Sequence, residues 1–142
     1  GRDDVQLCRG ERLPKESLSC AKELGIQLPE GKAIQFGQSL FWVPEQMPEL
    51  TRLKVLRPGL ELGSVQKGRF LPTHALALWL KDCANTEDFA AESREMAAYM
   101  HGDVVPSKKT GWCLVTVGGY SIGWGKGDAS VLKNHYPKGL RR

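Results

Sequence analysis

The 142-residue chain lacks any apolar stretch long enough to cross a membrane. Its longest unbroken apolar run, Ala75 to Leu80, has six residues, whereas a bilayer-spanning helix needs about 20. The N-terminal Gly1-Arg2-Asp3-Asp4 has neither an initiator methionine nor the basic-then-apolar layout of a secretory signal peptide. We therefore expect no membrane partner, and we expect the chain to be part of a longer protein.

Cysteine is sparse and widely spaced. The four cysteines, at positions 8, 20, 83 and 113, form no C-x-x-C pair, and a chain of this length can build a core without disulfides. The three histidines, at positions 74, 101 and 135, are equally scattered, so no zinc-like ligand spacing exists. These patterns predict free thiols, no metal site and a cytoplasmic location.

Both common nucleotide-binding signatures are absent from the glycine-rich stretch 118–127. A phosphate-binding loop would need a glycine where Tyr120 stands and a hydroxyl residue where Gly127 stands. The dinucleotide fingerprint would need a third glycine at Asp128. Neither a phosphate-binding loop nor a dinucleotide site is therefore expected.

Candidate catalytic groups are few. Cys113 falls in an alternating apolar segment, where a small buried thiol is ordinary, although a pairing with His74 or His135 is compatible with the sequence. Glu92 and Glu95 lie in an acidic segment and are expected to be solvated. We expect no catalytic residue, and we keep a small cysteine hydrolase as an alternative.

The net charge of +4 is distributed unevenly along the chain. Residues 51–81 contain six Lys/Arg and one Asp/Glu, and residues 104–142 contain seven and one. Residues 82–103, between them, contain one Lys/Arg and six Asp/Glu. In the folded protein the charges of these segments either cancel, giving an ordinary mixed surface, or the two basic segments form one side that faces a polyanion.

The sequence predicts an α+β fold. Periodicity, caps and turn residues predict a helix over 14–24, a hairpin over 33–43, a bent strand over 53–65, a helix over 74–81 capped by Thr73, a helix over 89–101 capped within Asn85–Asp88, a hairpin over 112–125 and a helical turn over 128–134.

The second strand of the last hairpin has one bulky face and one nearly bare face. Alternation places Tyr120, Ile122 and Trp124 together, and small residues at 121, 123 and 125 opposite them. A bare strand face forms where another part of the protein packs closely or where a ligand does. Packing is the ordinary reason.

Three short clusters combine cations with aromatic residues: Lys67–Phe70, Trp124–Gly127 and Lys133–Tyr136. RNA is recognised by Lys and Arg at phosphates and by aromatic planes at unstacked bases, so each cluster has suitable chemistry. All three lie in the two basic segments. The pattern favours a cationic groove for a nucleic-acid strand.

Four blocks carry a family resemblance. They are Gly59-Leu60-Glu61-Leu62-Gly63, the stretch from Lys67 to Ala77, Gly123-Trp124-Gly125-Lys126 and the stretch from Leu132 to Arg141. In order and spacing, residues 30–142 resemble the C-terminal region of Sun/Fmu-type ribosomal RNA cytosine-5 methyltransferases. Thr73 stands where the family is expected to have serine, and it keeps the capping hydroxyl.

The resemblance implies two parts. Residues 1–82 would form a small mixed α/β connecting domain, and residues 83–142 a PUA-like β pseudo-barrel with flanking helices that binds RNA. The parent enzymes use S-adenosylmethionine and two cysteines of a preceding domain to methylate a cytosine of 16S rRNA. None of the four cysteines here has the Pro-Cys or Thr-Cys-Ser context of those two, so no catalytic residue carries over.

The resulting hypothesis is a non-catalytic, monomeric module for ribosome biogenesis that positions ribosomal RNA and contacts its own catalytic domain. The expected RNA-binding residues are Lys67, Arg69, Trp124, Lys126, Lys133, Asn134 and Tyr136. His74 is either a structural residue at a helix start or an RNA contact. The alternative function is a scaffold that packs on the catalytic domain without touching RNA.

Overall fold

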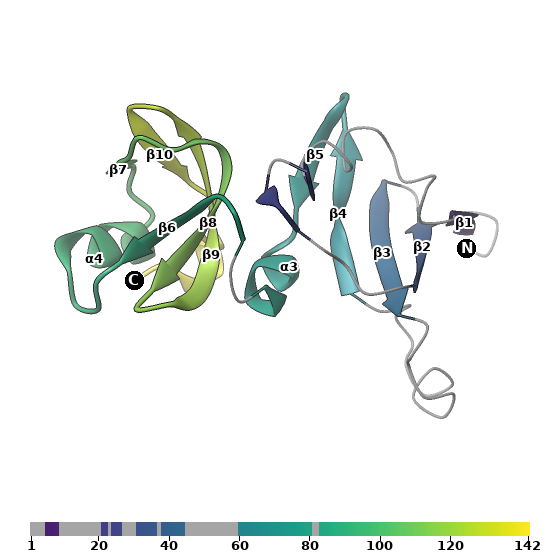
Figure 1. Ribbon diagram of the computed structural model, residues 1–142, viewed down its shortest axis with the longest axis horizontal. Coiled ribbons are helices and arrows are strands. Elements are labelled where there is room, and N and C mark those ends of the chain that lie inside the picture. Colours follow the sequence, from purple (N-terminus) through teal and green to yellow (C-terminus); the bar gives the residue numbers. More distant parts are fainter. Residues whose placement is uncertain are drawn as a thin grey trace. The chain divides into compact units, whose positions relative to one another are not determined.

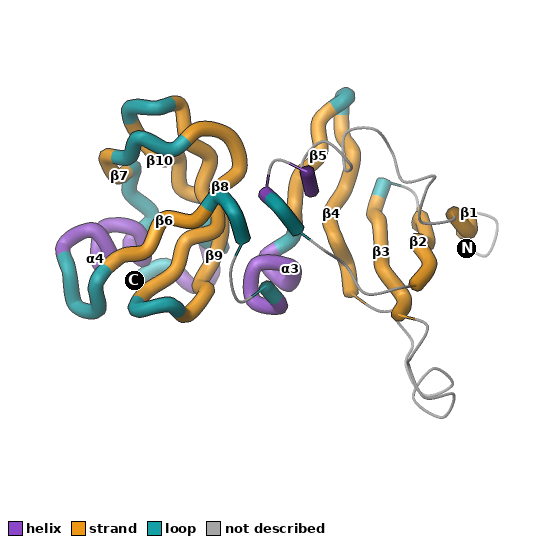
Figure 2. Tube along the Cα trace, viewed as in Figure 1, coloured by secondary structure: helices purple, strands orange, loops and turns teal. Residues whose placement is uncertain are grey.

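The computed structural model of the chain describes residues 5–8, 21–22, 24–26, 31–36, 38–44, 60–80 and 83–142 (Figure 1). The chain divides into two compact units, residues 1–21 with 27–76 and residues 22–26 with 77–142. Each unit has its own five-stranded sheet (Figure 2). A small sheet followed by a curled half-barrel sheet confirms the expected α+β fold class. The expected domain division after residue 82 stays a prediction.

The sheet of the first unit is an antiparallel meander. Its strands, in both chain and sheet order, are β1 (Val5–Cys8), β2 (Gly31–Phe36), β3 (Ser39–Pro44), β4 (Leu60–Gln66) and β5 (Arg69–Pro72). The β2–β3 pair confirms the predicted hairpin. The bent strand begins at Leu60, and residues 53–59 lie outside the described residues. Of the helix predicted over 14–24, residues 21, 22 and 24 are helical and the others lie outside them.

A tight turn and a capped helix follow β4. Lys67 and Gly68 have φ values of 51° and 74°, as a two-residue hairpin turn requires. Helix α3 (His74–Trp79) begins after Thr73, whose Oγ1 accepts a hydrogen bond from the Leu76 N–H at 3.0 Å. The predicted cap is confirmed, and the helix ends two residues earlier than expected.

The second unit places one parallel strand beside an antiparallel set. Its sheet order is β6 (Thr86–Phe89), β8 (Thr110–Val117), β9 (Tyr120–Asp128), β10 (Val131–Asn134) and β7 (Val105–Pro106), with β6 parallel to β8. Helix α4 (Arg94–His101) and the 3₁₀ helix η3 (Lys138–Leu140) complete it. Gly118 and Gly119 form the predicted β8–β9 turn, with positive φ at both positions. None of the described helices is long and apolar enough to span a membrane.

The bare face of β9 is covered by the protein itself. The core cluster of this unit consists of Phe89, Tyr99, Val105, Cys113, Val115 and Leu132. A Cβ at Gly123 would collide with the Tyr99 hydroxyl, and one at Gly125 would lie 2.5 Å from Leu132. The Tyr99 hydroxyl donates to the Trp124 carbonyl at 2.8 Å. Close packing therefore explains these glycines.

The predicted start of the long helix is wrong. Thr86–Phe89 is strand β6, and α4 begins only after Ser93, whose Oγ accepts from the Met96 N–H at 3.1 Å. Asp88 does not serve the helix dipole, because its Oδ1 accepts from the Thr116 hydroxyl and the Gly119 N–H. Pairing with β8 outweighs the local capping pattern. The predicted end is confirmed, since Gly102 is the left-handed C-cap.

The predicted helical turn over 128–134 is also wrong. Asp128 Oδ1 accepts from the N–H groups of Ser130 and Val131, each at 2.9 Å, which makes a side-chain-stabilised turn into strand β10. An aspartate side chain that accepts hydrogen bonds from the backbone N–H groups two and three residues later occurs both at helix caps and in turns. The antiparallel partner β9 selects the strand.

A bulge changes the predicted faces of β9. The β8–β9 register shifts between Val115 and Thr116, so Ile122 has no directly opposed partner. Ile122 packs against the core cluster, whereas Trp124 contacts Trp112. Tyr120 is 80% exposed. The expectation that these three residues share one face is therefore wrong, because strict alternation ends at the bulge.

Substituting Gly123 with alanine should destabilise the second unit, because the new methyl group must displace Tyr99. Overpacking of this kind costs about 1–3 kcal/mol. Urea unfolding followed by tryptophan fluorescence measures the loss. Gly139→Ala is the matched control, since no atom lies within 4 Å of a Cβ there. Equal stability of the two variants would contradict the packing role of Gly123.

Candidate nucleic-acid interface

Three residues form a row across the second sheet. Trp112 of β8 lies opposite Lys126 of β9, and Lys126 lies opposite Lys133 of β10. Directly opposed residues of antiparallel strands place their side chains on the same face. Both lysines are exposed. The sheet therefore brings together two of the predicted site residues from separate sequence clusters.

The Trp112 ring forms the floor of this row. The Lys126 ammonium lies 5.1 Å from its centroid, a cation–π geometry, and the His135 ring lies 4.6 Å from it in an edge-on arrangement. Trp124 contacts the same ring edge to face at 6.4 Å. Trp112 is itself 7% exposed. The indole thus orients the cations and offers little surface of its own.

Lys126 and Lys133 are like charges in direct cross-strand register, which destabilises a sheet. Among the described residues, an ion pair joins His101 Nδ1 to Asp103 Oδ1 at 3.1 Å. It involves neither lysine. Asp128 is near, but its carboxylate accepts the Val131 and Ser130 N–H groups, which lower its pKa more than the Lys133 charge does. An anion placed between the two ammonium groups would relieve their repulsion.

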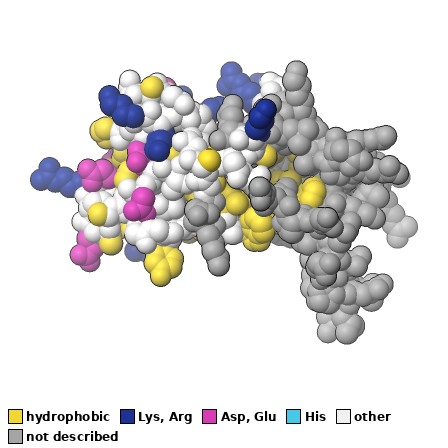
Figure 3. All heavy atoms as spheres, viewed as in Figure 1, with side chains coloured by type: hydrophobic (Ala, Val, Ile, Leu, Met, Phe, Trp, Pro, Cys, Tyr) yellow, Lys and Arg dark blue, Asp and Glu magenta, His cyan; other side chains and the backbone are white. Residues whose placement is uncertain are grey.

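His135 is the third cationic candidate at the row. Burial lowers the pKa of its imidazole, and the charges of Lys126, Lys133 and Arg141 lower it further. We name the exposed set Lys126, Lys133 and His135 the β9–β10 cluster. Figure 3 shows that the visible face of the second unit carries both acidic and basic side chains. Both signs of charge are therefore present on this face of the second unit.

The other predicted residues of the second unit serve the fold. Trp124 is 2% exposed, so a base cannot reach either face of its ring. Asn134 Nδ2 donates to the carbonyls of Tyr99 and Asp103, and its Oδ1 accepts from the Tyr136 N–H. The Tyr136 ring packs against Tyr99 with centroids 5.2 Å apart. All three residues hold β10 and the chain after it in place.

The remaining predicted residues belong to the first unit. Lys67 is exposed at the β4–β5 turn, and Arg69 is exposed at the start of β5. They lie two positions apart in the sequence of the β4–β5 hairpin. His74 begins α3 and is half-buried, and burial lowers its pKa. A joint groove formed by the two basic segments stays a prediction.

Sequence reasoning missed Trp112 and His135. His135 lies within the Lys133–Tyr136 cluster but was not named as a site residue, and the cross-strand register that places Trp112 opposite Lys126 is not readable from local patterns. The signal that existed was the Lys-Asn-His-Tyr run itself, in which a third potential cation follows Lys133 by two positions.

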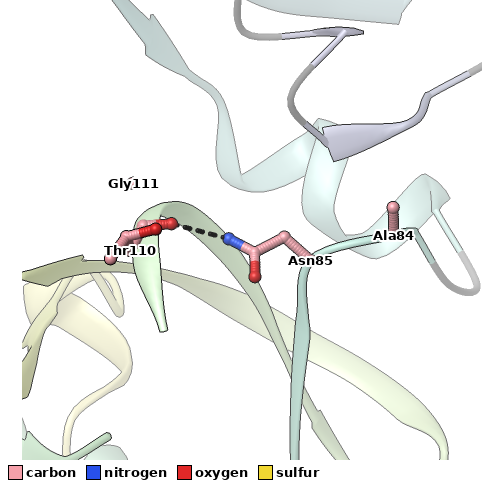
Figure 4. Close-up of a pocket in the computed structure, with 4 residues that line it drawn as sticks. All are labelled: Ala84, Asn85, Thr110 and Gly111. Atoms are coloured by element: carbon pink, nitrogen blue, oxygen red, sulfur yellow. Dashed lines mark hydrogen bonds between the residues drawn. The ribbon is translucent and has the colours of Figure 1, made fainter. Parts of the chain in front are cut away.

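A pocket lies beside the start of β8. It has a volume of about 590 Å³ and is lined by Ala84, Asn85, Thr110 and Gly111 (Figure 4). Asn85 Nδ2 donates to the Thr110 and Trp112 carbonyls at 2.9 and 2.8 Å. These four described lining residues carry no ionisable group.

Cys113 is unsuited to nucleophilic chemistry. Its side chain is 0% exposed in the core cluster, and burial raises its pKa to about 12. A thiolate, the reactive form, is thus strongly disfavoured at neutral pH. In the described part of the chain no three His, Cys, Asp or Glu side chains gather into a metal site. The hydrolase alternative has no support from this geometry.

Comparison with known protein families matches both parts of the chain. Residues 19–80 match the family described as RsmF rRNA methyltransferase first C-terminal domain. Residues 86–142 match the family described as Methyltransferase RsmF PUA domain. The resemblance drawn from the four sequence blocks is confirmed, as is a PUA-like fold for the second part.

In the native chain, Cys113 should resist alkylation while Cys83, which is half-buried, reacts. Peptide mass mapping after a short iodoacetamide pulse at neutral pH measures the two sites separately. Denaturant should make Cys113 react as readily as Cys83, because unfolding removes its burial. Rapid native labelling of Cys113 would overturn its assignment to the core.

Proposed function

Since the chain belongs to the RsmF rRNA methyltransferase family, with its first C-terminal domain and PUA domain, we propose that it is a non-catalytic region that binds and positions ribosomal RNA. The modified nucleotide would be a cytosine of 16S rRNA, and the reaction would take place in the cytoplasm. PUA domains typically bind RNA. The observation that carries the proposal is the paired exposure of Lys126 and Lys133 on one sheet face.

The lysine pair suits a phosphodiester backbone. Two ammonium groups on adjacent strands match the charge of an RNA strand that crosses this face of the sheet, and the β-ladder fixes their spacing. The β9–β10 cluster presents no exposed aromatic plane, since the rings of Trp112 and Trp124 are buried. Contacts of this type position the RNA without selecting a base sequence.

Lys67 and Arg69 would provide a second contact from the connecting domain, which we propose spans residues 1–82, with the PUA-like domain over 83–142. S-adenosylmethionine supplies the methyl group in this family and would bind to the catalytic domain. This chain's contribution, as a monomer beside its own catalytic domain, is to hold the RNA.

The affinity for RNA should fall steeply with salt. If Lys67, Arg69, Lys126 and Lys133 each neutralise one phosphate, the logarithm of the association constant should fall with log salt at a slope of about −3 for single-stranded RNA. Fluorescence anisotropy with a labelled 16S rRNA hairpin and a single-stranded segment measures this slope. A slope near zero for both RNAs would contradict phosphate binding.

Lys126→Ala with Lys133→Ala should weaken binding and reduce the magnitude of the slope by about 1.4, because two contacts are lost. Arg94→Ala is the matched control, since it removes an exposed cation at the start of α4, within the acidic segment. If the control weakens binding as much, the proposed site is wrong. Binding to the isolated catalytic domain with none to RNA would replace the proposal with the scaffold function.

A further inference from the structure

The position of His135 is fixed more tightly than its exposure suggests. Its backbone N–H donates to the Trp124 carbonyl at 3.2 Å, which ties the residue after β10 to β9. Its ring stands edge-on against Trp112, whose opposite strand neighbour is Lys126. A backbone bond and a ring contact therefore hold this imidazole beside the two lysines.

The charged groups that face His135 are cations from three segments. They are Lys126 on β9, Lys133 on β10 and Arg141 in the segment after η3, while β8 contributes the neutral Trp112. Arg141 is itself held by its Nε–H, which donates to the Tyr136 carbonyl at 3.1 Å. These charges oppose protonation, as does burial, so the pKa of His135 is below its ordinary value. In the free protein these effects favour the neutral form of the ring.

We propose that His135 is the third ligand of the phosphodiester held by Lys126 and Lys133, and that it takes up one proton from solvent when RNA binds. This inference rests on the proposed function. The phosphate brings negative charge to the place where three cations oppose protonation. With that charge present, imidazolium becomes the favoured form and one of its N–H groups donates to a phosphate oxygen. No covalent bond changes.

The consequence is an RNA affinity that depends on pH. Binding that takes up a proton strengthens as pH falls and weakens as pH rises, until the histidine stays neutral in both states. The pKa of His135 is lowered in the free protein and should rise in the complex. The pH dependence therefore falls between these two values, in the range where histidine titrates.

The test compares RNA binding by the 142-residue chain from about pH 8 to about pH 5.5. Wild type should bind roughly tenfold more tightly at the lower pH, the effect of one charge-assisted hydrogen bond. His135→Gln should lose this gain and match wild type at the higher pH. His135→Arg should bind tightly at both, because its charge is permanent. Circular dichroism checks that each variant is folded.

His101→Gln is the control, because His101 is exposed on α4 and pairs with Asp103 instead of the lysines. It should keep the full pH dependence. Nuclear magnetic resonance of the imidazoles adds a direct readout: RNA should raise the pKa of His135. An unchanged pH profile in His135→Gln, or an unmoved His135 pKa, overturns this inference alone. Absence of RNA binding at every pH overturns the proposed function with it.

Discussion

The contact between Tyr99 and the glycine face of β9 is the constraint on which the second unit depends. Because Gly123 and Gly125 have no side chains, Tyr99 and Leu132 approach the strand directly. The Tyr99 hydroxyl then donates to the Trp124 carbonyl, which also receives the His135 N–H. The helix, β10 and the residues after it are thereby fixed against one strand. The register that sets Lys133 opposite Lys126 follows from this arrangement.

The β9–β10 cluster lowers the stability of the sheet but provides positive charge for binding an anion. Opposed lysines weaken a sheet, yet here they stand beside a third group whose protonation they suppress. The buried Trp112 ring offsets part of this repulsion through its cation–π contact with Lys126. An anion at this sheet face would relieve the remaining repulsion between the lysines, and this is the physical reason for the proposal that the RNA backbone binds there.

Short sequence patterns predicted the turns and helix ends that depend only on neighbouring residues. The Gly118-Gly119 turn, the Thr73 cap and the Gly102 helix end follow from short sequence patterns, and all three are confirmed. The patterns failed at Asp88 and Asp128, because both carboxylates satisfy backbone donors in turns that strand pairing selects. The two lysines were predicted in separate clusters, because residues 128–134 were expected to form a helical turn instead of strand β10, which pairs with β9. Trp112 was missed because its place opposite Lys126 depends on the β8–β9 register, and His135 was recognised only as a member of the Lys133–Tyr136 cluster.

The parallel pairing of β6 with β8 bears on the order in which the second unit assembles. The pairing joins Thr86 to Leu114, across α4 and β7, whereas β8 and β9 are linked by a two-residue turn. Closing a long loop loses more chain entropy than closing a short one, so distant pairings form late. We expect the β8–β9 hairpin to nucleate folding and β6 to dock last.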